Sequence, residues 1–239
     1  MAPAGPDPPA GGEGGRALRP RRRRREPMAY ILGRKGFRGL ELAVTPAVLV
    51  PRPETELLVE WVVAHAPPGA RVLDWGTGSG AIALACARAF PRARVDALDI
   101  SPPALAVCRR NIRKLGLGSR VQAMRSDHLD AVSGTRYDIL VSNPPYVGRA
   151  EMRRLPREYL HEPALGLASG RDGLDSVRII LRQARAHLND HGILTVEVGN
   201  SERTLLRAFP RLPFIWPIFE RGGGGVFILR AQDLVGIGG

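Results

Sequence analysis

The chain has 239 residues, and its 44% of apolar residues suffice for the core of one α/β domain or of two small domains. Its 35 lysines and arginines outnumber 23 acidic residues and give a formal net charge of +12, which favours anionic partners such as RNA or ribosomal particles. No apolar run approaches roughly 18 residues and no segment has the order of a signal peptide, so we expect a soluble cytoplasmic protein without membrane contact.

Residues 1–27 contain mainly proline, glycine and arginine and have almost no apolar side chains. Because such a segment cannot bury a core, we predict a disordered arm. The arm carries five consecutive arginines, Arg21, Arg22, Arg23, Arg24 and Arg25. This charge block has two interpretations: a tether that contacts ribosomal RNA, or a solvated tail that precedes an older start at Met28.

Residues 28–66 predict a lead-in that packs against the main domain near its active-site edge. Residues 36–44 alternate between polar and apolar side chains and carry turn glycines, which indicates a small β-hairpin. Residues 54–65 carry an apolar stripe with helical spacing that includes Leu58 and Trp61, which indicates an amphipathic helix.

We place the main domain at residues 67–239, where predicted strands alternate with predicted helices. The strands cover residues 72–75, 95–100, 121–125, 137–142 and 193–198, and the helices cover residues 81–90, 102–115 and 174–188. Such alternation indicates an α/β fold with a mostly parallel sheet. Residues 213–220 and 226–230 differ, because a run of glycines joins them, and here we predict a final antiparallel hairpin.

A glycine-rich turn follows the first strand of the main domain and consists of Gly76, Thr77, Gly78, Ser79 and Gly80. Its backbone amides can approach a pyrophosphate or the carboxylate of an amino acid. Asp74 at the end of the strand places a carboxylate where it can meet the ammonium of S-adenosylmethionine, which favours this cofactor over NAD. Asp99 lies 19 residues after Gly80 and can bind both ribose hydroxyls, a feature that NAD sites share.

Two further residues are candidates for the adenine end of the cofactor. Asp127 and His128 follow the third strand of the domain, at the edge where the adenine would lie. Asp127 can accept a hydrogen bond from the exocyclic amine, and His128 can lie against the ring. A solvated loop histidine is the alternative for His128.

The fourth strand of the domain ends in Asn143, Pro144, Pro145 and Tyr146. Neither proline can donate a ladder hydrogen bond, so the strand stops here, at the edge of the sheet where ligands bind. A rigid turn of this kind holds an amide side chain and backbone carbonyls beside an aromatic ring. It can grip a planar amide, with the carbonyl oxygens accepting its two N–H groups and Tyr146 covering its face. Asn143 borders both the cofactor and the substrate in this interpretation.

The order of Asp74, the three glycines, Asp99 and the Asn143–Tyr146 turn resembles that of the S-adenosylmethionine-dependent protein glutamine methyltransferases, over about residues 28–232. Residues 162–174 are similar to a stretch specific to this family. Residues 51–56 look like the branch that acts on peptide-chain release factors. Residues 197–201, and residues 213–216 together with 225–227, look like the branch that acts on the third protein of the large ribosomal subunit.

The resemblance implies a Rossmann-like, seven-stranded methyltransferase sheet, mostly parallel with the C-terminal antiparallel hairpin. It implies methyl transfer from S-adenosylmethionine to a glutamine side-chain amide, with the large-subunit ribosomal protein as the favoured substrate and the Gly-Gly-Gln glutamine of release factors as the alternative. The family normally carries a helical substrate-binding domain before this point, where the chain has 27 low-complexity residues. We therefore expect cofactor binding to be retained, while substrate affinity and choice remain open.

Three other functions compete with this interpretation. The net charge of +12 and the Asn-Pro-Pro-Tyr turn also suit amino methylation of adenine or guanine in a nucleic acid. The arginine block suits a non-enzymatic RNA-binding factor, and the glycine turn suits an NAD-dependent oxidoreductase. We expect no metal, because His161 and Glu162 have no partners at ligand spacing, and we expect a monomer.

Overall fold

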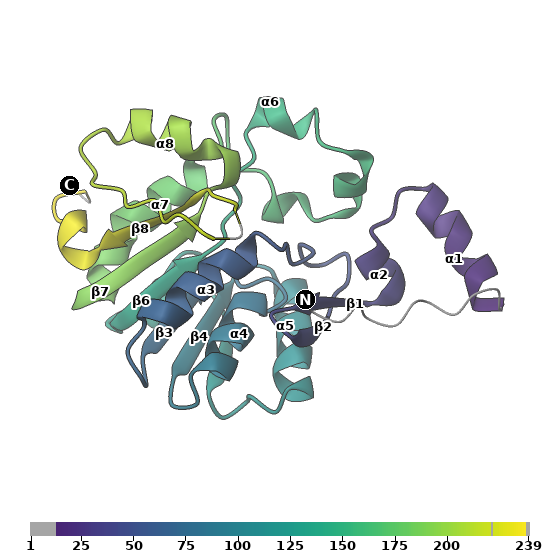
Figure 1. Cartoon of the computed structure of the whole chain (residues 1–239), viewed down its shortest axis with the longest axis horizontal. Helices are drawn as coiled ribbons and strands as arrows, with labels where there is room; N and C mark the ends of the chain where they lie inside the picture. Colours follow the sequence, from purple (N-terminus) through teal and green to yellow (C-terminus); the bar gives the residue numbers. More distant parts are fainter. Residues whose placement is uncertain (1–12, 221, 238–239) are drawn as a thin grey trace.

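The computed structural model describes residues 13–220 and 222–237. These residues form a central six-stranded sheet with helices on both faces, together with a separate two-stranded hairpin (Figure 1). The central strands are β3 (Arg71–Trp75), β4 (Arg94–Asp99), β5 (Val121–Arg125), β6 (Tyr137–Ser142), β7 (Leu188–Glu197) and β8 (Val226–Arg230). The helices are α1 (Glu13–Arg23), α2 (Met28–Leu32), α3 (Thr55–His65), α4 (Ala81–Ala89), α5 (Pro102–Lys114), α6 (Arg149–Met152), α7 (Asp175–Ala184) and α8 (Glu202–Ala208).

The strand order β5-β4-β3-β6-β7-β8 contains one point where the chain reverses its direction across the sheet. From β3 the chain adds β4 and β5 on one side, and it then returns to place β6 on the other side of β3. All neighbouring strands run parallel except β8, which pairs antiparallel with β7. In such a sheet a crevice opens beyond the carboxyl ends of the two strands at the reversal. The segments after β3 and β6 therefore meet in one place.

Two apolar layers hold the helices on the sheet. One layer packs α3, α4 and α5 against one face of the sheet, and the other packs α7 and α8 against the opposite face. The helix α4 carries only Ala, Ile, Leu and Cys on its buried positions, so its backbone approaches the sheet closely. The helix α5 begins at a proline and has an N-cap, because Ser101 Oγ accepts a hydrogen bond from the Ala104 N–H at 3.3 Å.

The predicted hairpin is present as β1 (Arg34–Phe37) and β2 (Leu40–Ala43), which pair antiparallel. A buried asparagine of α5, Asn111, ties it to the main domain. Its Oδ1 accepts from the Ala43 N–H at 2.7 Å, and its Nδ2 donates to the carbonyls of Ala43 at 3.0 Å and Ser79 at 2.9 Å. One side chain thus joins the hairpin to the glycine turn of the main domain.

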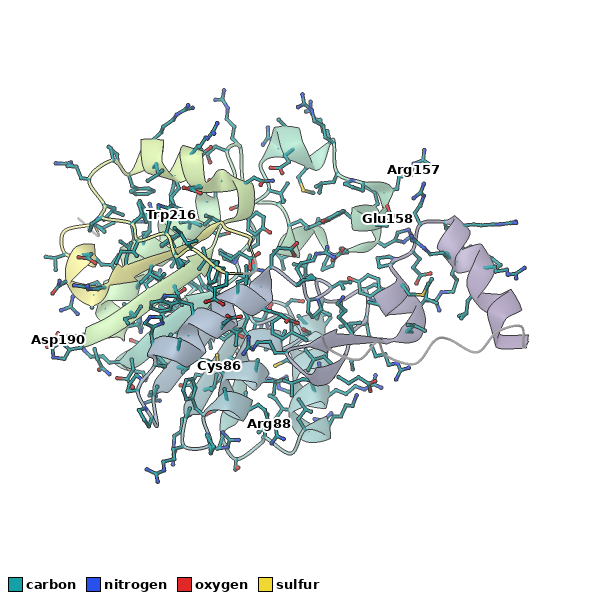
Figure 2. All side chains as sticks on the ribbon, viewed as in Figure 1. Cys86, Arg88, Arg157, Glu158, Asp190 and Trp216 are labelled. Atoms are coloured by element: carbon teal, nitrogen blue, oxygen red, sulfur yellow. The ribbon has the colours of Figure 1, made fainter. Side chains whose placement is uncertain are left out.

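The α/β class, the mostly parallel sheet and the antiparallel last strand are confirmed. The count of seven strands differs from the structure. In the part of the chain that the structure describes, residues 213–220 make only one bridge, from Ile215 to Ile228. The indole of Trp216 and the ring of Phe214 turn onto Phe227, so this segment packs by its aromatic rings and does not extend a ladder. Figure 2 shows Trp216 over this end of the sheet.

The arm also differs from its prediction. Residues 1–12 lie outside the described residues, but residues 13–23 form the helix α1 in place of the predicted disorder. Charge pairing explains the difference: Arg21 pairs with Glu26, and Arg25 and Arg22 reach the Glu158 carboxylate at 3.3 and 3.5 Å. Figure 2 shows Glu158 on the segment that faces α1.

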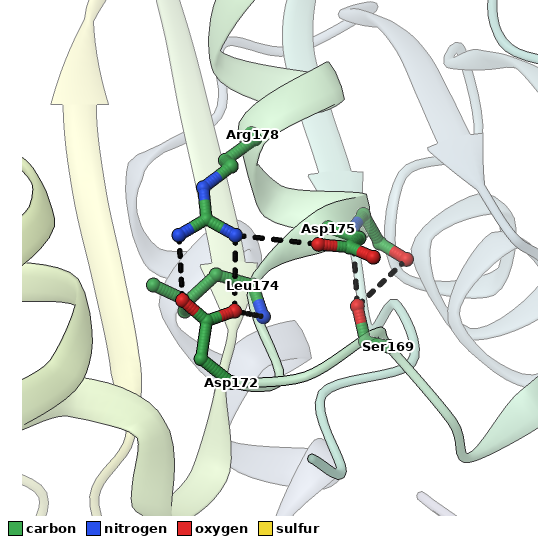
Figure 3. A network of polar contacts seen from close by, with 6 residues as sticks. Ser169, Asp172, Leu174, Asp175 and Arg178 are labelled. Atoms are coloured by element: carbon green, nitrogen blue, oxygen red, sulfur yellow. Dashed lines mark hydrogen bonds and ion pairs between the residues drawn. The ribbon is translucent and has the colours of Figure 1, made fainter. Parts of the chain in front are cut away.

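The segment between β6 and α7 folds back along itself. Val147 bridges Ala168, and the Arg149 N–H donates to the Gly170 carbonyl at 3.1 Å. A polar network then fixes the start of α7: Arg178 pairs with Asp172 at 2.6 Å, and Ser169 Oγ accepts from the Ser176 N–H at 3.0 Å (Figure 3). The family-like stretch 162–174 is therefore anchored at its far end.

None of the helices in the described ranges has the length and hydrophobicity of a membrane span.

Candidate active site

The glycine turn connects β3 to α4 through a left-handed backbone. Gly76, Gly78 and Gly80 have φ angles of +77°, +55° and +85°, which side chains other than glycine rarely adopt. The N–H groups of Gly76 and Thr77 donate to the Leu98 carbonyl at 2.9 and 2.8 Å, which joins the turn to β4. A Cβ atom on Gly80 would lie 2.9 Å from Cys108 Sγ, so this glycine also permits close packing of α5.

Asp99 ends β4 beside this turn. Its Oδ2 accepts from the Gly78 N–H at 2.8 Å, and its Oδ1 accepts from the Ser101 N–H at 2.9 Å. Burial raises the pKa of Asp99 above its usual range, against these backbone hydrogen bonds that lower it. The carboxylate therefore holds the turn in place and also lines the neighbouring cavity.

Asp74 lies beneath the turn and is fully buried. Its Oδ2 accepts from Thr77 Oγ1 at 2.6 Å and from the Ala83 N–H at 3.0 Å, while its Oδ1 has no hydrogen-bond partner in the described part of the chain. Burial raises the pKa of Asp74 to about 7. The residue does not line the cavity, so the structure places it as a brace of the turn, and a direct contact with a cofactor ammonium stays a prediction.

A cavity of about 330 Å³ opens beyond the carboxyl ends of β3, β4 and β6. The predicted site residues that line it are Gly76, Thr77, Gly78, Ser79, Asp99, Asp127, His128, Asn143, Pro144 and Pro145. Its size lies within the range of sites for small molecules and cofactors. The described structure thus brings together ten predicted site residues from four separate stretches of sequence.

The adenine-end candidates lie at the rim of this cavity. Asp127 is 67% exposed, and His128 has a left-handed backbone with φ of 59°. The His128 ring meets the ring of Trp75 edge to face, with a centroid distance of 6.2 Å. Trp75 lines the cavity too, although its sequence position at the end of a buried strand predicts only a structural role.

A second cavity, of about 620 Å³, adjoins the first. Tyr146, Tyr159 and Glu197 line it, and Asn143 lines both cavities. Tyr146 thus lines the second cavity, whereas Pro144 and Pro145 line the first. Asn143 stands at the junction.

Asn143 presents its oxygen without a protein partner. Its Nδ2 donates to Thr55 Oγ1 at 2.8 Å, while its Oδ1 is buried and accepts no hydrogen bond from any described residue. A buried amide oxygen left free costs free energy unless a ligand supplies a donor. The site therefore offers one unused acceptor at the point where the two cavities meet.

Tyr146 is held from three sides. Its hydroxyl donates to Glu197 Oε1 at 3.3 Å, and its carbonyl accepts from Ser201 Oγ at 3.1 Å. A Cβ atom on Gly199 would lie 2.7 Å from the ring, and one on Gly173 would lie 2.4 Å from the carbonyl oxygen. Burial raises the pKa of Tyr146, so its hydroxyl stays protonated and can donate.

A long-range ion pair closes the wall that the two cavities share. Arg52 bonds to Glu162, whose side chain is 1% exposed, and the second carboxylate oxygen accepts from the Val50 N–H at 3.0 Å. The Arg52 guanidinium also lies 4.8 Å from the centroid of the Tyr159 ring. Both residues belong to stretches that resemble the family, but the contact could not be predicted from the sequence, because no spacing rule links residues 110 positions apart.

The described residues contain no group of three or more His, Cys, Asp or Glu side chains that could hold a metal ion. Cys86 and Cys108 are free and buried, and burial raises the pKa of both thiols. Neither thiol is a nucleophile in this environment.

The chain is similar to proteins of known family. The family described as "Methyltransferase small domain" matches residues 53–170. The chain is 41% identical over 216 residues to the ribosomal protein uL3 glutamine methyltransferase of Francisella tularensis, covering 88% of the chain and 68% of that protein. It is 44% identical over 187 residues to the release factor glutamine methyltransferase of Moorella thermoacetica, covering 77% of the chain and 66% of that protein.

Among solved structures, a methyltransferase from Pyrococcus furiosus superposes with a TM-score of 0.60 at 21% identity, covering 91% of the chain and 96% of that structure. At this identity the likeness supports the fold alone.

Proposed function

The chain belongs to the protein glutamine methyltransferase family, and on this premise we propose that it methylates the side-chain amide nitrogen of a glutamine in a translation protein. The observation that carries the proposal is Asn143, whose buried oxygen is free at the junction of the two cavities. A glutamine amide that enters the second cavity would meet this acceptor next to a cofactor held in the first.

The first cavity fits S-adenosylmethionine. Asp99 offers a carboxylate for the ribose hydroxyls, the left-handed glycine turn allows close approach, and apolar side chains such as Ile100 and Ile179 line the remaining wall. S-adenosylmethionine supplies an activated methyl group on a sulfonium. The chain has to aim a poor nucleophile at it, since the lone pair of an amide nitrogen is delocalised into the carbonyl.

Positioning is the chemical task of the second cavity. We assign the Asn143 Oδ1 and the Pro144 carbonyl as acceptors for the two N–H groups of the substrate glutamine. Tyr146 and the two prolines hold the plane of its amide. Proximity and alignment of the nitrogen then provide much of the rate, and the proton leaves after methyl transfer.

We favour the large-subunit ribosomal protein uL3 as the substrate, because the similarity to the Francisella enzyme extends over more of the chain than the similarity to the Moorella enzyme. The release-factor glutamine is the alternative substrate, since residues 51–56 resemble the branch that acts on release factors. The reaction would then take place in the cytoplasm, with the protein acting as a monomer. The arginines at positions 21–25 would contact ribosomal RNA.

The test is methyl transfer from labelled S-adenosylmethionine, offered separately to uL3 and to a release factor and followed by product mass spectrometry. We expect label on a glutamine of uL3. Label on the release factor alone would move the assignment to the alternative. Label on neither protein, with label appearing in RNA or DNA, would overturn the proposal in favour of nucleic-acid methylation.

Asn143→Ala supplies the matched variant. It should abolish transfer while S-adenosylmethionine still binds, as measured by the cofactor-induced shift in Tm. Turnover that persists in this variant contradicts the role of the amide oxygen.

A further inference from the structure

A buried polar cluster lies beside Asn143: Thr55 lines the cofactor cavity and Glu197 lines the second cavity. Thr55 begins α3 and is 4% exposed, and Glu197 ends β7 and is 2% exposed. Thr55 accepts the Asn143 Nδ2–H at 2.8 Å, and Glu197 accepts the Tyr146 hydroxyl at 3.3 Å. Glu197 Oε2 has no further partner within the described ranges. Burial of a carboxylate costs free energy unless the groups around it stabilise the charge.

The orientation of the Asn143 amide decides what it can bind. Its oxygen and nitrogen ends have almost the same shape, so only hydrogen-bond partners distinguish one orientation from the other. In this orientation the nitrogen faces Thr55, and the oxygen has no partner among the described residues, on a side chain that lines both cavities. A flipped amide would present two donors to the substrate amide, which itself needs acceptors.

The Glu197 carboxylate favours the observed orientation. Burial raises the pKa of Glu197 to about 7, against its polar neighbours Thr55, Tyr146 and Asn143, which lower it. An anion beside the nitrogen end attracts its N–H groups and would repel the oxygen of a flipped amide. We propose that Glu197 and Thr55 form a positioning pair that locks the Asn143 amide with its oxygen towards the substrate. This inference rests on the proposed function, which requires the Asn143 oxygen to face the substrate amide.

The lock depends on the charge of Glu197, so activity should depend on pH. The carboxyl protonates below pH about 7, and its proton can then be donated to the oxygen of a flipped amide. The value of kcat/KM therefore rises with pH to about 7 and levels off above it. The titratable and charged groups that face Glu197 or share its cavity are Glu54, Tyr146, Arg52, Glu151, Tyr159, Glu202 and Arg203.

The first variant is Glu197→Gln, which keeps the shape and removes the charge. We expect kcat to fall roughly 10- to 100-fold, as for a misplaced reacting group, with the Kd of S-adenosylmethionine unchanged and the pH inflection lost. Thr55→Val should lower kcat in the same way, and Thr55→Ser should restore most of the loss because the hydroxyl returns. If Glu197→Gln does not fold, the comparison of Thr55→Val with Thr55→Ser tests the proposal in its place. Wild-type kcat in Glu197→Gln, or a pH inflection that survives in it, overturns the proposal.

A second measurement does not need catalysis. The Asn143 side-chain NH2 signals in a ¹⁵N-resolved NMR spectrum, assigned by their loss in Asn143→Ala, should shift in Glu197→Gln and in the wild type as the pH falls below 7. If the wild type methylates no glutamine, the proposed function fails while this spectrum still tests the lock. Signals that are unchanged by both treatments overturn the lock whatever the substrate.

Discussion

The two halves of the site are stabilised by different kinds of contact. The cofactor half is the glycine turn with the first cavity, and the substrate half is the Asn143–Tyr146 turn with the second cavity. In the cofactor half, the contacts that fix the glycine turn join near neighbours: Asp74 and Thr77 are 3 positions apart, and Gly78 and Asp99 are 21 apart. In the substrate half, the contacts join Tyr146 to Glu197 across 51 positions, Asn143 to Thr55 across 88, and Arg52 to Glu162 across 110. The glycine turn is thus fixed mainly within one strand–turn–helix unit and its neighbours, with Asn111 as a longer link, whereas the contacts of the substrate half join segments that are distant in the chain.

The difference suggests how the halves respond to change. A substitution in the cofactor half should alter cofactor affinity and leave the second cavity intact. A substitution in the substrate half should alter turnover or stability, because its contacts cross between elements that are distant in the chain. Each variant below tests whether an effect stays in the half where the change is made.

The largest effect should come from Arg52→Ala, which breaks the longest contact of the substrate half. It leaves the Glu162 carboxylate, which is 1% exposed, without its charged partner, and loss of one member of a buried pair typically costs about 3–5 kcal/mol. We expect the low end of that range, because Arg52 is 25% exposed. Urea unfolding measures the change in stability.

Arg34→Ala is the matched control for this variant. Arg34 pairs with Glu41 at 2.6 Å, but both side chains are more than half exposed. Its loss should change stability little. Equal effects of the two substitutions would show that the Arg52–Glu162 pair is no stronger than a surface pair.

The next effect should come from Asp99→Ala in the cofactor half. It removes the acceptor of two backbone N–H groups at 2.8 and 2.9 Å and the carboxylate assigned to the ribose. Hydrogen bonds to a charged group contribute about 1.5–3 kcal/mol, so the Kd of S-adenosylmethionine should rise roughly 10- to 100-fold by calorimetry. Asp127→Ala, at a carboxylate that is 67% exposed, should change Kd much less. If Asp127→Ala raises the Kd more than Asp99→Ala does, the contact at the adenine contributes more to cofactor binding than the contact at the ribose.

A smaller, more local effect should follow Gly199→Ala in the substrate half. The new Cβ would lie 2.7 Å from the Tyr146 ring, so the ring has to move away from its position. We expect kcat to fall roughly 10-fold with the cofactor Kd unchanged. Gly134→Ala is the control, because it has the same left-handed backbone, with φ of +75°, and no atom within 4 Å of the new Cβ. If both variants lose the same activity, backbone strain and not the Tyr146 contact is responsible.

The same contrast explains what the sequence could predict. The strands and helices around the glycine turn follow from alternation, turn glycines and the N-cap at Ser101, all of which act within a few residues. The cofactor cavity follows from them, because parallel strands bring their carboxyl ends to one edge. Thr55, Glu197 and the Arg52–Glu162 pair could not be placed, since their partners are set by packing between distant elements.

Two predictions, for residues 213–220 and for residues 13–27, differ from the structure for the same reason. Residues 213–220 have the composition of a strand, but the aromatic rings of Phe214 and Trp216 pack on Phe227, and only Ile215 pairs with β8. Residues 13–27 have the composition of a disordered arm, but their arginines meet Glu26 and Glu158. Composition describes a segment by itself, whereas Phe227 and Glu158, which contact these two segments, lie outside them.

The smallest effect should come from Glu158→Gln, which removes the acid that Arg25 and Arg22 reach at 3.3 and 3.5 Å. These side chains are largely open to solvent, so the global stability should hardly change, but α1 should detach from the substrate half more often. Trypsin cleavage after the arginines at positions 21–25 should accelerate roughly two- to fivefold, the size expected for an exposed ion pair. Glu220→Gln, at an exposed glutamate outside this contact, should leave the cleavage rate unchanged. Salt provides the internal check: at about 1 M the wild type should cleave as fast as the variant, because the Debye length falls to roughly 3 Å. If cleavage is equally slow in both proteins at low salt, these ion pairs do not hold α1, and the helix must be retained on the substrate half by other contacts.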